Sequence, residues 1–274
     1  MDYYEILGLE REPFSSSPDP AFFYFSDDYR ECLQRLEISI RLKRGLNIIL
    51  GPVGTGKTTL SRVLYRMFQR ESRDFVFHFI LDPSFPTEFQ FFSGLVKLFG
   101  ITPSGRSTFE YKEAIQNHLF QKGVEDRKTI VLLIDEGQKL SISHLEILRN
   151  LLNYETNEYK LLQLLIFAQM EFSDRVKGVE NFLDRVNMKY LFQPLNEVDT
   201  RKMIEFRLRI AGLNSGRSLF TDDAYMAIYG ETLGYPRKII NLCHHALLTM
   251  MIKEKKIIDG EIIRITAKAR GDQI

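Results

Sequence analysis

The fold of this chain is decided by the stretch Gly51-Pro52-Val53-Gly54-Thr55-Gly56-Lys57-Thr58. It fits the pattern G-x-x-x-x-G-K-[ST] at every fixed position. The apolar run Leu46–Leu50 before it is typical of a buried strand, and residues 59–69 have helical periodicity. A strand, a glycine-rich turn and a helix N-terminus in this order predict a phosphate-binding loop. A glycine-rich turn without a ligand is the alternative, and this context disfavours it.

Each part of the loop suits the phosphates of ATP and a Mg²⁺ ion. Glycines let backbone N–H groups approach phosphate oxygens, and the helix start adds partial positive charge. Lys57 supplies a positive charge to the outer phosphates, and Thr58 offers a hydroxyl to Mg²⁺. The residues expected to bind the nucleotide are Gly51, Pro52, Val53, Gly54, Thr55, Gly56, Lys57, Thr58 and Thr59.

Composition is that of an ordinary globular protein. The 274 residues are 44% hydrophobic and 27% charged, with a formal net charge of +1 that argues neither for nor against nucleic acid. Cys32 and Cys243 lie far apart, which indicates a reducing compartment. The acidic, aromatic start predicts no secretory signal. The densest apolar run, 161–168, is shorter than the ~20 residues of a membrane helix, so we expect a cytoplasmic protein.

Strands and helices alternate through most of the chain. Five strands are expected, at 46–50, 75–80, 129–134, 161–168 and 188–192. Helices are expected at 87–99, 109–120 and 143–153, besides those at 27–45 and 59–69. Continuous apolar strands in this alternation predict an α/β fold with a parallel sheet covered on both faces. After Asn196 only four helices are expected, at 197–211, 222–229, 236–253 and 260–268, which indicates a smaller all-α domain.

Three regions follow from this pattern. Residues 1–26 carry prolines, serines and four consecutive aromatics, and form a lead-in that packs on the core. Residues 27–195 form the α/β nucleotide-binding domain. Residues 196–274 form a helical lid domain.

The strand 129–134 ends in two adjacent carboxylates, Asp135 and Glu136. Ligands of parallel α/β sheets bind beyond the carboxyl ends of the strands. Asp135 would hold Mg²⁺ through its waters, and Glu136 would orient or deprotonate the attacking water. An N-cap Asp with an acidic first turn is the alternative. The phosphate loop on another strand of the same sheet favours the catalytic interpretation.

Two further polar residues follow structural elements. Gln169 comes after strand 161–168, where its amide would bond the γ-phosphate or the attacking water; a polar residue starting a loop is an equal alternative. Gly234 and Pro236 fix a turn, so that Arg237 leaves the first turn of a helix in a defined direction and would reach the nucleotide. By spacing alone, a solvent-facing Arg237 is the better-supported alternative.

As a set, these segments resemble the core of an AAA+ ATPase, and in particular the ExeA family of general secretion pathway protein A. The segments that carry the resemblance are 51–58, 135–138, Gln169 and 234–237, with 3–9, 13–14 and 18–24 resembling the family's start. Residues 161–163, 219–221 and 241–243 resemble the family as well. The resemblance covers nearly the whole chain. It implies a P-loop AAA+ three-layer sandwich with a five-stranded parallel sheet, followed by a small all-α lid.

The resemblance also implies roles. Lys57 and Thr58 match Walker A, and Asp135 and Glu136 match Walker B. Gln169 takes the sensor-1 position and Arg237 the sensor-2 position.

Residues 182–186 resemble the segment that carries the arginine finger. Arg185 is therefore the candidate to reach into a neighbouring subunit's site, with Arg175 as the second choice. A finger in trans makes hydrolysis depend on oligomerisation, because a monomer lacks that clamp on the γ-phosphoryl charge.

Two departures from the family pattern concern the sequence after Walker B and the chain's end. Gly137 and Lys139 stand where the family usually has Ala and Asn, at positions that are not catalytic. Secretion members commonly continue into a membrane span and a periplasmic peptidoglycan-binding domain. We therefore expect either a cytoplasmic part of a longer protein or a stand-alone branch, docked at the inner membrane through a partner or a missing C-terminal region.

Two functions are compatible with these residues. The first is an ATP-hydrolysing AAA+ protein that forms a homo-oligomeric ring or filament. It would drive assembly or remodelling in a secretion, pilus or envelope system, with a membrane-associated secretion or pilus protein as partner. A scaffold that binds ATP without hydrolysis is disfavoured, because both Walker B carboxylates are present.

For the adenine contact, only Phe25 is suggested, by its position near the domain junction.

The second function is an ATP-dependent DNA-binding regulator resembling transposition target-selection ATPases. Two groups of arginines would track DNA phosphates in that case: Arg62, Arg66, Arg70 and Arg73, and Arg201, Arg207 and Arg209. Solvated helix faces are the favoured interpretation of both groups, and the neutral net charge agrees, so DNA is not the favoured partner.

Overall fold

The computed structural model describes residues 2–17, 19–71, 73–214 and 216–271. Pro18 of the lead-in and residues 272–274 of the lid region lie outside the described residues. The chain divides into two compact units. The sheet unit contains residues 29–52 and 61–192, and the helical unit contains residues 1–28, 53–60 and 193–274. The domain boundaries expected from the sequence stay predictions.

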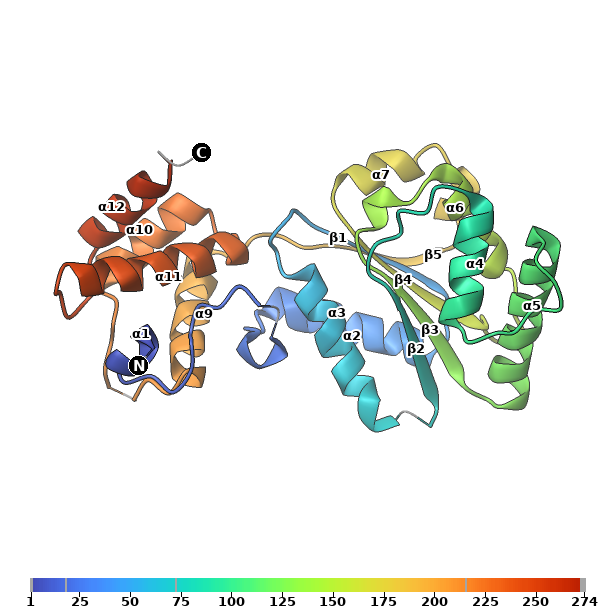
Figure 1. The fold of residues 1–274 in the computed structure, drawn as a ribbon, viewed down its shortest axis with the longest axis horizontal. Helices are drawn as coiled ribbons and strands as arrows, with labels where there is room; N and C mark the ends of the chain where they lie inside the picture. The colour runs from blue at the N-terminus through green and yellow to red at the C-terminus, as the bar shows by residue number, and fades with distance from the viewer. Residues whose placement is uncertain (1, 18, 72, 215, 272–274) are drawn as a thin grey trace. The chain divides into compact units, whose positions relative to one another are not determined.

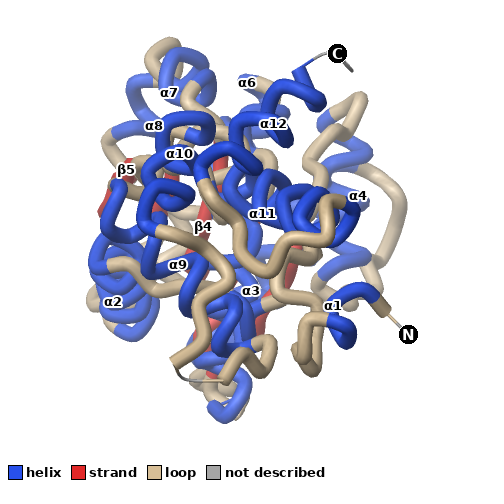
Figure 2. The backbone as a smooth tube through the Cα atoms, turned by 90° about the vertical axis from the view of Figure 1, so that its left-hand side faces the viewer, coloured by secondary structure: helices blue, strands red, loops and turns tan. Residues whose placement is uncertain are grey.

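A five-stranded parallel sheet forms the centre of the sheet unit (Figure 1). The strands are β1 (Leu46–Leu50), β2 (Phe75–Ile80), β3 (Thr129–Ile134), β4 (Leu162–Ala168) and β5 (Val186–Leu191). Their order is β2-β3-β4-β1-β5, and every pairing is parallel. The carboxyl ends of all five strands therefore lie along one edge. All strands of the described residues belong to this unit, drawn red in Figure 2.

Helices cover both faces of the sheet. They are α2 (Asp27–Arg41), α3 (Lys57–Phe68), α4 (Glu88–Leu98), α5 (Thr108–Phe120), α6 (Ile142–Leu151), α7 (Glu171–Val176) and α8 (Glu180–Leu183). Phe91 of α4, Ile115 of α5 and Leu145 of α6 share one apolar core with alternate residues of β3 and β4, such as Leu132 and Leu164. Burial on both faces is why these strands read as continuous apolar runs.

Polar residues inside the sheet are matched by specific partners. The side chain of Gln163, which interrupts the apolar run of β4, accepts from the Gly45 backbone N–H at 2.8 Å and donates to the Lys160 carbonyl at 2.8 Å. On β1, Asn47 Oδ1 accepts from the Ser39 hydroxyl of α2 at 2.8 Å. These bonds offset the cost of burying the amides.

The helical unit is built from α1 (Tyr3–Ile6), η1 (Pro20–Phe22), α9 (Glu197–Ile210), α10 (Asp222–Thr232), α11 (Pro236–Ile252) and α12 (Gly260–Gly271). The four helices expected after Asn196 are confirmed. Asn196 caps α9 by accepting from the Asp199 N–H at 2.8 Å, and Pro236 occupies the first turn of α11. None of the helices in the described residues has both the length and the apolar character needed to cross a bilayer.

The N-terminal lead-in packs on α9 through a buried guanidinium. Arg207 is only 5% exposed and donates to the carbonyl oxygens of Pro13 at 2.8 Å, Ser15 at 3.0 Å and Phe22 at 3.1 Å. Burial lowers the pKa of Arg207 to about 10, so it stays charged at neutral pH. The prediction that Arg201, Arg207 and Arg209 lie together on a solvated helix face is therefore wrong for Arg207, because its guanidinium is buried against lead-in carbonyls.

Candidate active site

The phosphate loop begins at the carboxyl edge of the sheet. The Gly51 N–H donates to the Ala168 carbonyl at 3.2 Å, which continues the pairing of β1 with β4 by one residue. The chain then passes through the loop to Lys57, the first residue of α3. Gly54 and Gly56 have φ of +83° and +93°, a conformation that side chains disfavour. The positive φ angles therefore favour glycine at positions 54 and 56 of the motif.

Within the helical unit, the loop contacts the start of α11. The Arg237 backbone N–H donates to the Gly54 carbonyl at 3.1 Å. A Cβ added at Gly54 would lie 2.9 Å from the Arg237 Cβ, which is too close for any side chain. Arg237 is the residue that the sequence proposes to reach the nucleotide from the lid. Its backbone is in direct contact with the phosphate loop. Its side chain is exposed.

The turn before α11 fixes the position of Arg237. Gly234 has φ of +73°, and a Cβ there would lie 1.8 Å from the Leu195 carbonyl oxygen, so only glycine fits. The Gly234 carbonyl in turn accepts from the Leu195 N–H at 2.9 Å. Tyr235 is the N-cap and Pro236 the first helical residue. The Gly and Pro that the sequence singled out are therefore the residues that hold this helix start.

At the end of β3 the chain enters what we call the Walker B turn, residues 135–140. Asp135 is 5% exposed, and its N–H donates to the Ile80 carbonyl at 2.9 Å. Its Oδ1 accepts from the Glu136 N–H at 2.9 Å. Glu136 has φ of +52° and ψ of 38°, in the left-handed region that is costly for a residue with a side chain. The chain turns at Glu136 into the short helix η4 (Gly137–Lys139).

An ion pair ties this turn to the neighbouring strand end. Lys139 Nζ lies 2.9 Å from Asp82 Oδ2, just after β2. The hydrogen bond to Asp82 raises the pKa of Lys139. The pKa of Asp82 is lowered, first by the hydrogen bond from the Ser84 hydroxyl and then by Lys139. Both side chains are exposed, so the pair contributes little to stability.

The structure brings the predicted residues Gln169 and Glu136 together. Gln169 directly follows β4, and its side-chain Nε2 lies 3.4 Å from Glu136 Oε2. Its backbone N–H donates to Gln138 Oε1 at 3.0 Å. Gln138 lies in the segment 135–138 that carries the family resemblance, but the sequence predicts no role for it. Its contacts depend on the packing of η4 beside β4, which no sequence pattern shows.

The three site segments follow three adjacent strands. The phosphate loop follows β1, Gln169 follows β4, and Asp135 with Glu136 follow β3, in the sheet order β3-β4-β1 (Figure 1). Polar and glycine-rich segments at the carboxyl ends of neighbouring parallel strands form the usual ligand position of such sheets.

The two candidate fingers lie at different edges of the sheet. Arg185 immediately precedes β5, whose first residue pairs with Leu46 at the start of β1. It therefore lies at the amino edge, opposite the edge of Glu136, and its side chain is exposed. Arg175 of α7 instead donates to the Leu140 carbonyl of the Walker B turn at 2.8 Å. The structure does not bring Arg185 to the carboxylates of its own chain.

The remaining aromatic prediction concerns Phe25. Its ring packs edge-on against Phe23, with centroids 5.0 Å apart. A contact with adenine stays a prediction.

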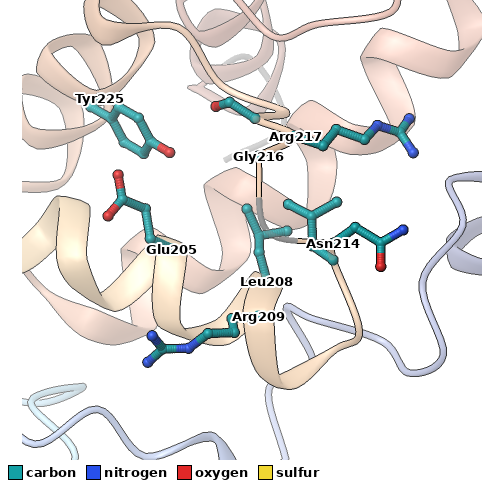
Figure 3. A pocket seen from close by; sticks show the side chains of 9 residues that line it. Glu205, Leu208, Arg209, Asn214, Gly216, Arg217 and Tyr225 are labelled. Atoms are coloured by element: carbon teal, nitrogen blue, oxygen red, sulfur yellow. The ribbon is translucent and has the colours of Figure 1, made fainter.

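A separate cavity of about 200 Å³ lies in the helical unit, between α9, α10 and the loop that joins them (Figure 3). Glu205 and Tyr225 lie on one side of it, with Asn214 and Arg217 on the other (Figure 3). It contains no residue of the predicted site and is smaller than most ligand pockets. We assign the candidate site to the segments that directly follow β1, β3 and β4, because these segments carry the phosphate-loop motif, the two carboxylates and Gln169.

The protein oxygens available for Mg²⁺ suit the ion only if a bound nucleotide supplies further ligands. Among residues 2–17, 19–71, 73–214 and 216–271, no cluster of three or more His, Cys, Asp and Glu side chains is present to hold a metal alone. Magnesium is commonly bound by one or two protein oxygens with phosphates and waters. The Asp135 carboxylate and the Thr58 hydroxyl match that chemistry.

Comparison with known proteins agrees with this architecture. Residues 40–176, half of the chain, match the family model described as AAA domain. The chain belongs to the AAA domain family. This AAA domain protein is also 31% identical over 264 residues to General secretion pathway protein A of Aeromonas hydrophila. That match covers 95% of the chain and 47% of the relative, so the chain spans about half the length of the curated protein it matches.

Solved structures share the fold of the AAA domain protein. Cdc6p of Pyrobaculum aerophilum matches with a TM-score of 0.71 and 19% identity, over 94% of this chain and 70% of that one. ORC1 of Aeropyrum pernix, solved in complex with DNA, gives 0.69 and 17%, over 95% and 69%. The RuvB Holliday junction branch migration motor of Thermotoga maritima gives 0.59 and 16%, over 89% and 69%. The expected AAA+ α/β fold is confirmed.

Proposed function

We propose that this protein binds ATP with Mg²⁺ and hydrolyses it to ADP and phosphate. The observation that carries the proposal is that the phosphate loop, Gln169 and the Asp135–Glu136 pair directly follow three neighbouring strands, β1, β4 and β3. The phosphate loop supplies the nucleotide site, and Glu136 on the same edge supplies a carboxylate for the attacking water. Membership of the AAA domain family supports the same activity.

The proposed roles of the residues follow from their chemistry. The loop N–H groups and Lys57 bind the β- and γ-phosphates. Thr58 and Asp135 would hold Mg²⁺, which when bound supplies positive charge to the phosphate oxygens. Glu136 accepts a proton as the water oxygen bonds to the γ-phosphorus and the bond to the β–γ bridging oxygen breaks. Gln169 donates to the γ-phosphate, and Arg237 contributes charge from the lid.

We further infer that the protein works as a homo-oligomer, a ring or a filament. Arg185 is exposed at the edge of the sheet away from Glu136. An arginine in that place serves a γ-phosphate only if the phosphate belongs to another copy of the chain. The identity to General secretion pathway protein A supports a membrane-associated secretion or pilus protein as the partner on which the oligomer acts.

Nucleotide binding is tested by titrating a fluorescent ATP analogue with Mg²⁺. We expect Lys57→Ala to weaken binding by about 10- to 100-fold, because a charge-assisted bond to phosphate contributes about 1.5–3 kcal/mol. Lys97→Ala, which removes an exposed lysine of α4, is the matched control and should bind like the wild type. Equal affinity in Lys57→Ala and the wild type would contradict the assignment of the loop.

A further inference from the structure

The carboxylate of Glu136 is held by two side-chain amides. Gln138 Nε2 lies 2.5 Å from Glu136 Oε2, and Gln169 Nε2 lies 3.4 Å from the same oxygen. The three side chains are partly buried. Gln138 makes the shorter contact of the two, although it belongs neither to the Walker motifs nor to the sensor positions.

Gln138 uses both ends of its amide. Its Oε1 accepts from the Gln169 backbone N–H at 3.0 Å, while its Nε2 donates to Glu136. A backbone N–H only donates and an ionised carboxylate only accepts, so these two neighbours together fix which end of the amide is oxygen. The side chain therefore bridges the end of β4 to the carboxylate in one orientation.

This bridge depends on close packing of η4 against β4. A Cβ added at Gly137 would lie 2.4 Å from Ile166 Cγ2 and 3.2 Å from the Ala168 Cβ. The absence of a side chain at Gly137 lets the turn approach the strand. That approach brings Gln138, the next residue, within hydrogen-bond distance of Gln169.

We propose that Gln138 is a positioning residue for hydrolysis: it holds Glu136 Oε2, so that the other carboxylate oxygen, Oε1, takes the proton of the attacking water. This inference rests on the proposed ATPase function and deepens it. The two amides then have separate tasks. When Gln169 turns its NH₂ group to the γ-phosphate, Gln138 remains anchored by the Gln169 backbone and keeps Glu136 in place.

The test measures steady-state hydrolysis and ATP binding in Gln138→Ala and Gln138→Glu. Glutamate has nearly the length of glutamine but is ionised and has no N–H to donate. We expect both variants to lower kcat by about 100-fold, the loss typical of a misplaced catalytic group, with the Kd for ATP within about twofold of wild type. Wild-type kcat in either variant would overturn the proposal.

Lys139→Ala is the matched control for disturbance of the turn. Lys139 follows Gln138 in η4 and pairs with Asp82, and its loss should leave kcat near the wild-type value. If Lys139→Ala loses as much activity as Gln138→Ala, the integrity of the turn, and not the amide, is responsible, and the proposal fails.

A second measurement asks whether Gln138 acts through Glu136. In single-turnover experiments, Gln138→Ala added to Glu136→Gln should lower the rate no further, because the residue that Gln138 positions is already disabled. A further loss of about 100-fold would show an independent role and overturn the proposal. If the wild type itself hydrolyses no ATP, the proposed function fails first, which is a different result from unchanged kcat in the Gln138 variants.

Discussion

At the scale of single residues, the Walker B turn combines strain with close packing. Glu136 adopts a left-handed backbone conformation, and Gly137 next to it leaves no room for a methyl group. Such backbone conformations persist only where the surroundings enforce them. Here the enforcing contacts are the hydrogen bond from the Glu136 N–H to Asp135 and the packing of Gly137 on Ile166.

Gly137→Ala tests this packing. The added methyl would meet Ile166 Cγ2 at 2.4 Å, so β4 or the turn must move. We expect a loss of about 1–3 kcal/mol in the free energy of unfolding, measured by urea denaturation, together with a lower kcat. The cost of Gly137→Ala should be smaller in an Ile166→Ala background, where the clashing group is absent. The same cost in both backgrounds would contradict the packing account.

At the scale of elements, α9 links the lead-in to the helical unit through Arg207. Its three bonded carbonyls belong to Pro13, Ser15 and Phe22, and Tyr24 adds a hydrogen bond to Asp199 at 2.9 Å. The aromatic lead-in is therefore part of the helical unit's structure.

Arg207→Met should separate the lead-in from α9. Methionine fills part of the space but leaves the three carbonyls without a donor, which we expect to lower the free energy of unfolding by about 2–5 kcal/mol. Protease cleavage within residues 1–26 should become faster. Arg209→Met, on the same helix with an exposed side chain, should change stability by less than about 0.5 kcal/mol. Equal stability of the two variants would show that the buried guanidinium is not needed.

Elements with a long apolar pattern could be predicted from the sequence, and short ones could not. The strands β1, β2 and β3 have the expected bounds, whereas β5 begins at Val186, two residues before the expected start. The helices α1, α7 and α8 have four to six residues, too few to show a helical period, and were not expected.

The same limit applies to the site. The phosphate loop and the carboxylates are sequence motifs, so they could be read from local spacing. The roles of Gln138 and Arg207 arise from contacts with residues distant in sequence: Gln169 lies 31 positions from Gln138, and Pro13 lies 194 positions from Arg207. Spacing along the chain carries no signal for such contacts, and for Arg207 it suggested the opposite, an exposed side chain.

At the scale of the whole molecule, the proposed oligomer makes each active site depend on two chains. Arg185→Ala should abolish hydrolysis while leaving the variant's own phosphate loop intact. Lys57→Ala disables the loop but keeps Arg185. In an equal mixture we expect activity to return to about a quarter of the wild-type rate per site. Random assembly gives about one site in four both an intact Lys57 from its own chain and an intact Arg185 from the neighbouring chain.

The control for this mixture combines Lys57→Ala with Glu136→Gln. Both changes disable the chain's own site, so no assembly of these two variants contains an intact one, and activity should not return. A lack of recovery in the Arg185→Ala mixture at every ratio would contradict a finger in trans.

The most direct test of the account compares phosphate release by the wild type and Glu136→Gln, with ATP binding measured in parallel. The two side chains have nearly the same shape, but the amide does not accept a proton from water. We predict that kcat falls by about 10²- to 10⁴-fold while the Kd for ATP stays within about twofold. Equal turnover by the two proteins would contradict the claim that this sheet edge is an ATP-hydrolysing site with Glu136 at its centre.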